Sequence, residues 1–163
     1  ATGILHRGED IRPEKSMREI ESRSLAEVLA VNAIGPSLVA KHFLPRLRRD
    51  RKSVFAALSA RVGSIGDNRL GGWTAYRMSK AALNMLIRTM AIEQARTAPG
   101  SVVVALHPGT VSTDLSRPFT ARTPTSQLFT PQMAATRLLG VLDSLSPDQT
   151  GGFFAYDGAR IDY

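Results

Sequence analysis

Two short, almost uniformly apolar runs separated by a long helical pattern constrain the fold of this chain most. Residues 53–59 read Ser-Val-Phe-Ala-Ala-Leu-Ser, and residues 102–106 read Val-Val-Val-Ala-Leu. Both have the length of a strand and neither alternates in polarity, which is typical of strands covered on both faces. Strands that alternate with helices predict an α/β fold with a parallel sheet. We expect the strand at 53–59 to lie in the centre of that sheet.

The N-terminal part of the chain is expected to end a strand and then to form a long helix. Residues 1–5 predict the end of a short buried strand. A capping box that begins at Ser24 opens a helical pattern over residues 24–47. Asn32 and Pro36 interrupt this pattern. Because proline costs about 3 kcal/mol inside a helix, we expect a kink near Asn32 that frees polar backbone groups.

Two further helices and a last strand complete the expected order. The helical pattern over residues 75–96 carries a broad apolar face. Residues 115–129 form a loop rich in proline, serine and threonine, which in an α/β domain commonly covers a site. A helix over 130–143 with proline in its first position precedes a strand at 153–156. We expect residues 1–163 to form a single domain.

Composition narrows the possible chemistry. The chain has no cysteine, so disulfides, thiolate metal sites and cysteine nucleophiles are excluded. No cluster of His, Asp and Glu has the spacing of a metal site, and we expect no metal. No apolar run approaches the roughly 20 residues that cross a bilayer, and no signal sequence is visible. The chain is therefore predicted to be cytoplasmic and to bind no membrane.

The formal net charge of +7 raises the question of nucleic-acid binding. The densest basic run, residues 46–52, follows an apolar helical segment, where cations complement the negative end of the helix dipole. The other arginines are scattered, and basic and aromatic residues do not alternate as they do in single-strand binding surfaces. We expect no nucleic-acid partner.

Tyr76 and Lys80 are four residues apart in the predicted helix at 75–96, so their side chains project from one face. A nearby ammonium favours the phenolate form of tyrosine and lowers the phenol pKa from its usual value of about 10. A tyrosine tuned in this way acts as a general acid or base near neutral pH. For an isolated pair, a packed tyrosine beside a solvated lysine is the alternative, and the neighbouring segments decide between them.

Three polar segments are predicted to meet at one edge of the sheet. Ser64 follows the strand at 53–59, Tyr76 begins the next helix, and the loop at 108–113 follows the strand at 102–106. Ligands of open parallel sheets bind beyond the carboxyl ends of the strands. A hydroxyl, a tyrosine and a lysine gathered there suit proton transfer to a carbonyl oxygen. Carbonyl reduction is therefore the expected reaction class.

Several motifs in this order resemble the short-chain dehydrogenase/reductase superfamily. They are Leu-Ser-Ala-Arg-Val-Gly-Ser-Ile at 58–65, Gly-Gly-Trp at 71–73, Tyr-Arg-Met-Ser-Lys at 76–80 and His-Pro-Gly-Thr-Val-Ser-Thr at 107–113. Together with the ending Gly-Phe-Phe-Ala-Tyr-Asp-Gly at 152–158, they resemble its C-factor and sniffer-like carbonyl reductase branch. The resemblance implies a three-layer, doubly wound, Rossmann-like parallel sheet. It also implies NAD(P)-dependent hydride transfer to or from a small carbonyl or alcohol substrate.

The resemblance assigns roles to particular residues. Tyr76 is implied to be the general acid/base, and Lys80 to lower its pKa and to hold the cofactor ribose. Asn32 matches the helix asparagine that positions a proton-relay water. The loop implied to face the nicotinamide of NAD or NADP contributes Pro108, Gly109, Val111 and Thr113.

The resemblance leaves the catalytic serine open. The family's usual position, three residues before the loop glycine, is Ala60 here, with Ser59 before it and Ser64 beyond Gly63. We favour Ser64 because it lies in the loop beyond the strand, and Ser59 is the alternative. If neither hydroxyl reaches the substrate oxygen, catalysis is expected to be impaired.

The family's glycine-rich dinucleotide-binding segment matches nothing in this chain. Residues 1–4 resemble the end of the family's fourth strand, so the chain is expected to be the C-terminal part of a Rossmann domain in a longer reductase. The alternative is a non-catalytic signalling or interaction module. The helices at 24–47 and 75–96 carry more apolar surface than one sheet face needs. Because family members commonly pair through these two helices, a homodimer or homotetramer is expected.

Overall fold

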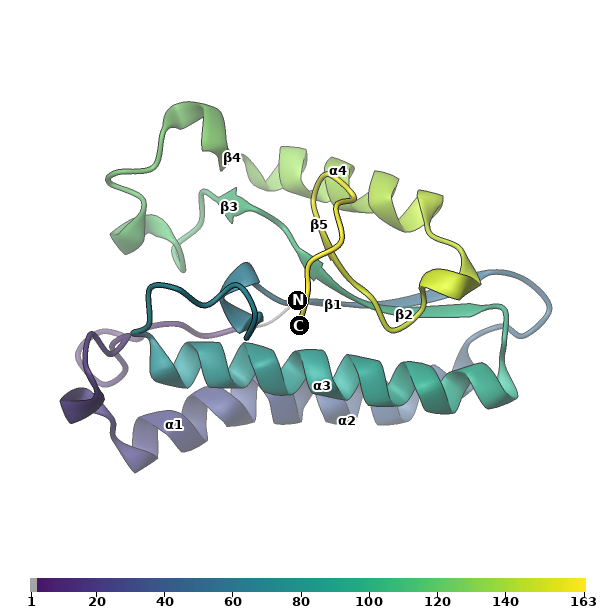
Figure 1. Ribbon diagram of the computed structural model, residues 1–163, viewed down its shortest axis with the longest axis horizontal. Helices are drawn as coiled ribbons and strands as arrows, with labels where there is room; N and C mark the ends of the chain where they lie inside the picture. Colours follow the sequence, from purple (N-terminus) through teal and green to yellow (C-terminus); the bar gives the residue numbers. More distant parts are fainter. Residues whose placement is uncertain (1–2) are drawn as a thin grey trace.

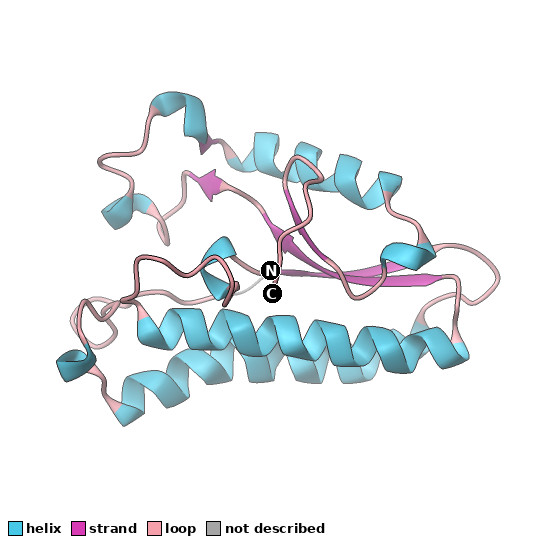
Figure 2. Ribbon diagram, viewed as in Figure 1, coloured by secondary structure: helices cyan, strands magenta, loops and turns pink. Residues whose placement is uncertain are grey.

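The computed structural model describes residues 3–163, and the sheet of this part has three parallel strands (Figure 1; Figure 2). The strands β1 (Ser53–Leu58), β2 (Ser101–His107) and β5 (Phe153–Ala155) pair in the order β1-β2-β5. Ser53 lies opposite Ser101, and Ala105 lies opposite Phe153. The predicted α/β fold with a parallel sheet is confirmed.

The central strand of this sheet is β2, and not β1. The strand β2 pairs with β1 on one side and with β5 on the other, and residues 101–106 are buried. Among the described strands, β1 pairs only with β2, and most of its residues are half-buried. The prediction that 53–59 lies in the centre is therefore wrong. An apolar run indicates that both faces are covered, but it carries no information about how many strands pair with it.

Helices cover both faces of the sheet, which gives the three layers seen in Figure 1. One face is covered by α4 (Pro131–Ser144). The helices on the other side are α1 (Ser22–Leu29), α2 (Gly35–Phe43) and α3 (Thr74–Thr97). A separate parallel pair, β3 (Thr110–Val111) with β4 (Leu128–Phe129), lies beyond the end of β2.

Alternate residues of β2 divide the core into two parts, because successive side chains of a strand point to opposite faces. Val103 and Ala105 pack in a cluster with Leu83 and Ile87 of α3. On the other face the cluster contains Val102, Val104, Leu138, Val141 and Leu145. The strand is thus covered on both sides, as its uniformly apolar sequence predicts.

The long helix predicted over 24–47 is interrupted where expected. A π-helical turn over Ala30–Ile34 separates α1 from α2, and Asn32 lies inside it. Pro36 falls in the first turn of α2, where a missing backbone N–H costs least. The π-turn therefore places Asn32 where the helical hydrogen-bond ladder is irregular.

The predicted capping box at Ser24 does not form. The helix begins at Ser22 without a side-chain cap. Glu27, the acidic member of the expected box, forms an ion pair with Arg7 instead. A tertiary partner has therefore displaced the local hydrogen bond that the motif predicts.

The expected strand end at residues 1–5 is not observed in the described part of that segment. Residues 1–2 lie outside the described residues, and residues 3–5 form no strand. The backbone N–H and C=O of Ile4 bond to the side chain of Asn32, at 2.7 and 2.8 Å. The side-chain amide of Asn32 thus satisfies the backbone hydrogen bonds of Ile4 that a neighbouring strand would otherwise make.

The segment Ser22–Arg46 has the length and hydropathy, 1.2, of a helix that could cross a membrane. The expectation that no run approaches that length is therefore wrong by this measure. Length and composition do not separate such a helix from one that packs in a folded core. Here Val28 and Ala40 are buried, and α1 packs against α3.

Candidate active site

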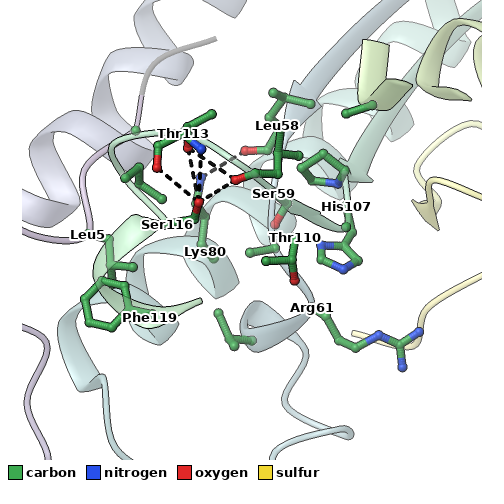
Figure 3. Close-up of a pocket in the computed structure, with 18 of the residues that line it drawn as sticks. Leu5, Leu58, Ser59, Arg61, Lys80, His107, Thr110, Thr113, Ser116 and Phe119 are labelled. Atoms are coloured by element: carbon green, nitrogen blue, oxygen red, sulfur yellow. Dashed lines mark hydrogen bonds between the residues drawn. The ribbon is translucent and has the colours of Figure 1, made fainter. Parts of the chain in front are cut away.

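A pocket of about 700 Å³ lies beyond the carboxyl ends of β1 and β2 (Figure 3). Its wall is built from the residues after β1, the first turns of α3, the segment from the end of β2 to Thr123, and α4. The polar or reactive side chains in its lining include Ser59, Arg61, Tyr76, Lys80, His107, Thr110, Thr113 and Ser116. The predicted meeting of strand ends and helix start therefore forms a real cavity.

Tyr76 and Lys80 lie on the same wall of this pocket. The Lys80 Nζ atom is 5.6 Å from the centre of the Tyr76 ring. It donates a hydrogen bond to the carbonyl oxygen of Leu58 at the end of β1, at 2.9 Å. Lys80 is only 4% exposed, so the helix spacing and the strand end together fix its ammonium inside the protein.

Burial decides the pKa values of both groups. It raises the pKa of Tyr76 to about 12 and lowers the pKa of Lys80 to about 8. The expected lowering of the Tyr76 pKa by Lys80 is therefore not the net effect in this structure. The phenolate is the charged form of tyrosine, and its loss of hydration on burial raises the phenol pKa. At neutral pH the phenol holds its proton and is able to donate it.

Asn32 lies behind the pocket and is fully buried. Both of its amide hydrogens are used, one on the carbonyl of Ile4 and one on Ser79 Oγ at 2.9 Å. A Cβ on Gly3 would lie 3.5 Å from Asn32 Oδ1 and 3.6 Å from Lys80 Nζ, so these groups are neighbours. The structure brings Asn32 close to Lys80 without placing it in the pocket wall.

Neither candidate serine offers a free hydroxyl hydrogen to the pocket. Ser64 is buried and outside the lining, and its Oγ accepts the backbone N–H of Asp67 at 3.1 Å. Ser59 lines the pocket, but its hydroxyl donates to Asn84 Oδ1 at 2.7 Å. Ala60 lines the wall next to it. A methyl group therefore occupies the position where the resemblance implies the catalytic hydroxyl.

The loop after β2 reaches the same pocket. Pro108, Gly109, Val111 and Thr113 all line it. Gly109 has φ +78°, and a Cβ there would lie 2.6 Å from the ring of Phe129, so only glycine fits. The pairing of β3 with β4 holds this loop in place. The structure thus brings every residue predicted to face the nicotinamide to the wall that carries Tyr76 and Lys80.

Two aromatic residues in the lining were not assigned a role by the sequence motifs. The Trp73 ring meets Phe119 edge-on, with ring centres 4.9 Å apart, and it meets Tyr76 at 6.4 Å. Phe119 belongs to the loop expected to cover a site, and its place at the pocket fits that expectation. Trp73 immediately precedes the helix that carries Tyr76, and this position in the sequence could have placed it at the pocket.

His107 also lines the pocket. Its Nδ1 is buried and has no hydrogen-bond partner among the described residues, and burial lowers the pKa of His107 to about 4 with a further contribution from the charge of Arg61. The ring is therefore neutral near pH 7. Its position at the last residue of a strand, on the ligand-binding edge, was the available signal. Within residues 3–163 no group of three or more His, Asp or Glu side chains is placed to hold a metal ion.

A family model described as short chain dehydrogenase matches residues 3–124. This chain belongs to the short-chain dehydrogenase family. Over 147 residues this short-chain dehydrogenase is 37% identical to C-signal of Myxococcus xanthus, and the match covers 90% of the chain and 82% of that protein. Over 135 residues it is 34% identical to 1-hydroxy-2-glutathionyl-2-methyl-3-butene dehydrogenase of Rhodococcus sp.. That match covers 83% of this chain and 57% of the Rhodococcus protein.

Solved structures of carbonyl reductases share its fold. The carbonyl reductase Sniffer of D. melanogaster superposes with a TM-score of 0.84 at 25% identity, covering 100% of this short-chain dehydrogenase and 64% of that chain. An NADPH-bound carbonyl reductase from chicken fatty liver gives a TM-score of 0.80 at 28% identity. The match covers 98% of this chain and 64% of the chicken enzyme's chain. The predicted membership of the C-factor and sniffer-like branch and the partial, Rossmann-like fold are confirmed.

Proposed function

We propose that the protein containing this chain is an NAD(P)-dependent carbonyl reductase in which Tyr76 is the general acid/base. The observation that carries the proposal is the pair of half-buried Tyr76 and buried Lys80, which shares one pocket with the glycine-containing loop after β2. Membership of an oxidoreductase family supports it, as do carbonyl reductases among the structures of similar fold.

The residues present fit the nicotinamide half of such a cofactor. Gly109 leaves the loop backbone without a side chain at its closest approach to Phe129 and Tyr156. The ammonium of Lys80 has three donors, and among residues 3–163 it makes one hydrogen bond, to Leu58, so donors remain for a ribose hydroxyl. Bound NADH or NADPH supplies the hydride. Lys80 and the loop residues Pro108, Val111 and Thr113 would hold the ribose and nicotinamide.

The chain's own residues then handle the proton. Tyr76, protonated at neutral pH because its pKa is about 12, donates its proton to the carbonyl oxygen as that oxygen becomes an alkoxide. The Lys80 ammonium stabilises the phenolate that remains. At Ala60 no hydroxyl is present to donate a second hydrogen bond to the substrate oxygen, which limits the stabilisation of the transition state.

The test is turnover of a panel of aldehydes and ketones with NADH and with NADPH, by the wild-type protein and by Tyr76→Phe. Loss of the general acid is expected to lower kcat by about 100-fold or more, with little change in cofactor affinity. Tyr163→Phe is a matched control, since its hydroxyl donates to the Gly151 carbonyl outside the pocket lining. Undiminished turnover by Tyr76→Phe would remove Tyr76 from the mechanism.

A signalling or interaction role is the second candidate. The observation that favours it is the similarity to C-signal, of which this chain covers 82%, whereas it spans 57% of the Rhodococcus dehydrogenase and 64% of the two reductase structures. This role requires surface contacts and no turnover. Absence of turnover across the panel, with the fold intact, would favour it over reduction.

We also propose that two copies pair through the face formed by α2, the π-turn and α3. Large apolar side chains are exposed along these neighbouring elements, where a second copy would cover them. They are Ile34, Leu38, Val39, Phe43, Met78, Met85 and Ile92. In a twofold dimer the same patch of both copies meets, so this face of one copy would cover the same face of the other.

A further inference from the structure

The helix that carries Tyr76 begins at an unfavourable turn. Gly71, Gly72 and Trp73 have φ values of +63°, +65° and 52°, so three successive residues adopt the left-handed conformation. Trp73 is the one non-glycine residue with positive φ in the described part of the chain. A left-handed backbone is costly for a bulky side chain, and it persists only where neighbouring groups hold it.

Glu14 supplies the groups that hold this turn. Its carbonyl oxygen accepts the N–H of Trp73 at 2.6 Å. Its carboxylate accepts the N–H of Ala75 through both oxygens, at 3.2 and 3.3 Å. Trp73 occupies the N-cap position but makes no side-chain cap, so a residue distant in sequence does the capping.

The Glu14 carboxylate has no cationic partner in the described part of the chain. It is only 3% exposed, and no ion pair of residues 3–163 includes it. A buried carboxylate needs compensation, and the partial positive charge at the start of α3 provides it. The placement of Glu14 is thus coupled to the first turn of α3.

The turn matters because the reacting side chain follows it directly. Tyr76 is the next residue after Ala75, and the Trp73 ring lies against both Tyr76 and Phe119 in the pocket. We infer that Glu14 is a positioning residue, which holds Trp73 and the first turn of α3 so that the Tyr76 phenol stays in place for proton transfer. The inference rests on the proposed reductase function, but its effect on Trp73 can be measured without turnover.

The experiment compares Glu14→Ala, Glu14→Gln and Glu9→Ala. Glu9 is an exposed control on the same N-terminal segment, where its carboxylate pairs with Arg12. Trp73 is the only tryptophan, so acrylamide quenching of its fluorescence reports on this turn alone. Because small displacements of a catalytic group can cost about 100-fold, we expect Glu14→Ala to lower kcat by about 10- to 100-fold, with little change in KM.

Glu14→Gln keeps one acceptor oxygen but loses the charge that complements the helix dipole, so its kcat should fall by about 3- to 10-fold. Acrylamide quenching of Trp73 should increase in Glu14→Gln and increase further in Glu14→Ala. Glu9→Ala should match the wild type in both kcat and quenching. Wild-type kcat and quenching in Glu14→Ala would overturn the inference, and so would lower thermal stability with unchanged kcat. If Glu14→Ala does not fold, unchanged values in Glu14→Gln would overturn it. A wild-type protein without turnover would contradict the proposed function, while quenching would still decide the role of Glu14.

Discussion

Replacing the buried lysine of the pocket by an uncharged side chain of similar length should make the folded protein more stable while removing its activity. Burial lowers the pKa of Lys80 from 10.5 to about 8. At about 1.4 kcal/mol per pKa unit, holding the charged form costs the folded state about 3 kcal/mol at pH 7. Lys80→Met also loses the hydrogen bond to the Leu58 carbonyl, worth about 1–2 kcal/mol. We expect a net gain of about 1–2 kcal/mol at pH 7.

The dependence on pH separates this explanation from a general packing effect. Below pH 8 the lysine is protonated in both states, so the penalty is present in full. Between pH 8 and 10.5 the unfolded chain binds more protons at Lys80 than the folded protein does, so wild-type stability rises with pH. Above 10.5 both states are neutral and the penalty is gone. The advantage of Lys80→Met should therefore shrink and then change sign as the pH rises, because only the lost hydrogen bond to Leu58 remains when both states are neutral.

Urea unfolding followed by circular dichroism, at pH values from 7 to 10.5, measures this difference. Lys15→Met is the control, because Lys15 is exposed and its ammonium has no burial to relieve. Differences between each variant and the wild type at the same pH remove the contribution of other titrating groups. A free energy of unfolding for Lys80→Met at or below that of the wild type at pH 7, with the same difference at pH 10, would refute the reasoning.

Three other substitutions have defined outcomes. Ala60→Ser places a hydroxyl on the pocket wall and is expected to raise kcat for carbonyl reduction by about 10-fold or more, whereas an unchanged kcat would mean that another group already binds the oxygen. Gly63→Ala puts a Cβ 2.8 Å from the backbone carbon of Lys80, so denaturation should show a loss of about 1–3 kcal/mol; Gly140→Ala, where the added Cβ meets open space, is the control. Met85→Glu, on the exposed apolar face of α3, should convert a dimer to a monomer in sedimentation, while Met17→Glu, away from that face, should not; a wild-type monomer at all concentrations would contradict the proposed pairing.

Elements set by local apolar pattern could be predicted closely from the sequence. The helix expected at 75–96 runs over Thr74–Thr97, and the strand expected at 102–106 runs over Ser101–His107. The place of β1 in the sheet could not be predicted, because strand pairing depends on partners that the strand's own sequence does not encode. The capping box failed for a similar reason, since Glu27 found a partner in Arg7.

In the site, too, residues in local motifs could be predicted from the sequence, whereas contacts between distant segments could not. Tyr76, Lys80 and the loop after β2 lie within short motifs whose spacing is local, and the structure brings them to one pocket. Ser64 resembles a catalytic serine in sequence, but it is buried outside the pocket lining, where its oxygen accepts the N–H of Asp67 in a tight turn. The bond from Ala75 to Glu14 joins residues 61 positions apart, and no periodicity or spacing in the sequence indicates such a contact.

The pocket's electrostatics, combined with the proposed function, suit the proton-donating step of carbonyl reduction. A phenol with a pKa of about 12 is a competent proton donor near neutral pH, but its phenolate, which alcohol oxidation requires, is scarce there. Lys80, with a pKa of about 8, is charged at the same pH and stabilises the phenolate only as the proton leaves. The burial that opposes a resting phenolate therefore does not oppose reduction. If Tyr76 is the general acid, as proposed, a site with these two shifts and a methyl group at Ala60 depends on the tyrosine as the main proton donor to the substrate oxygen.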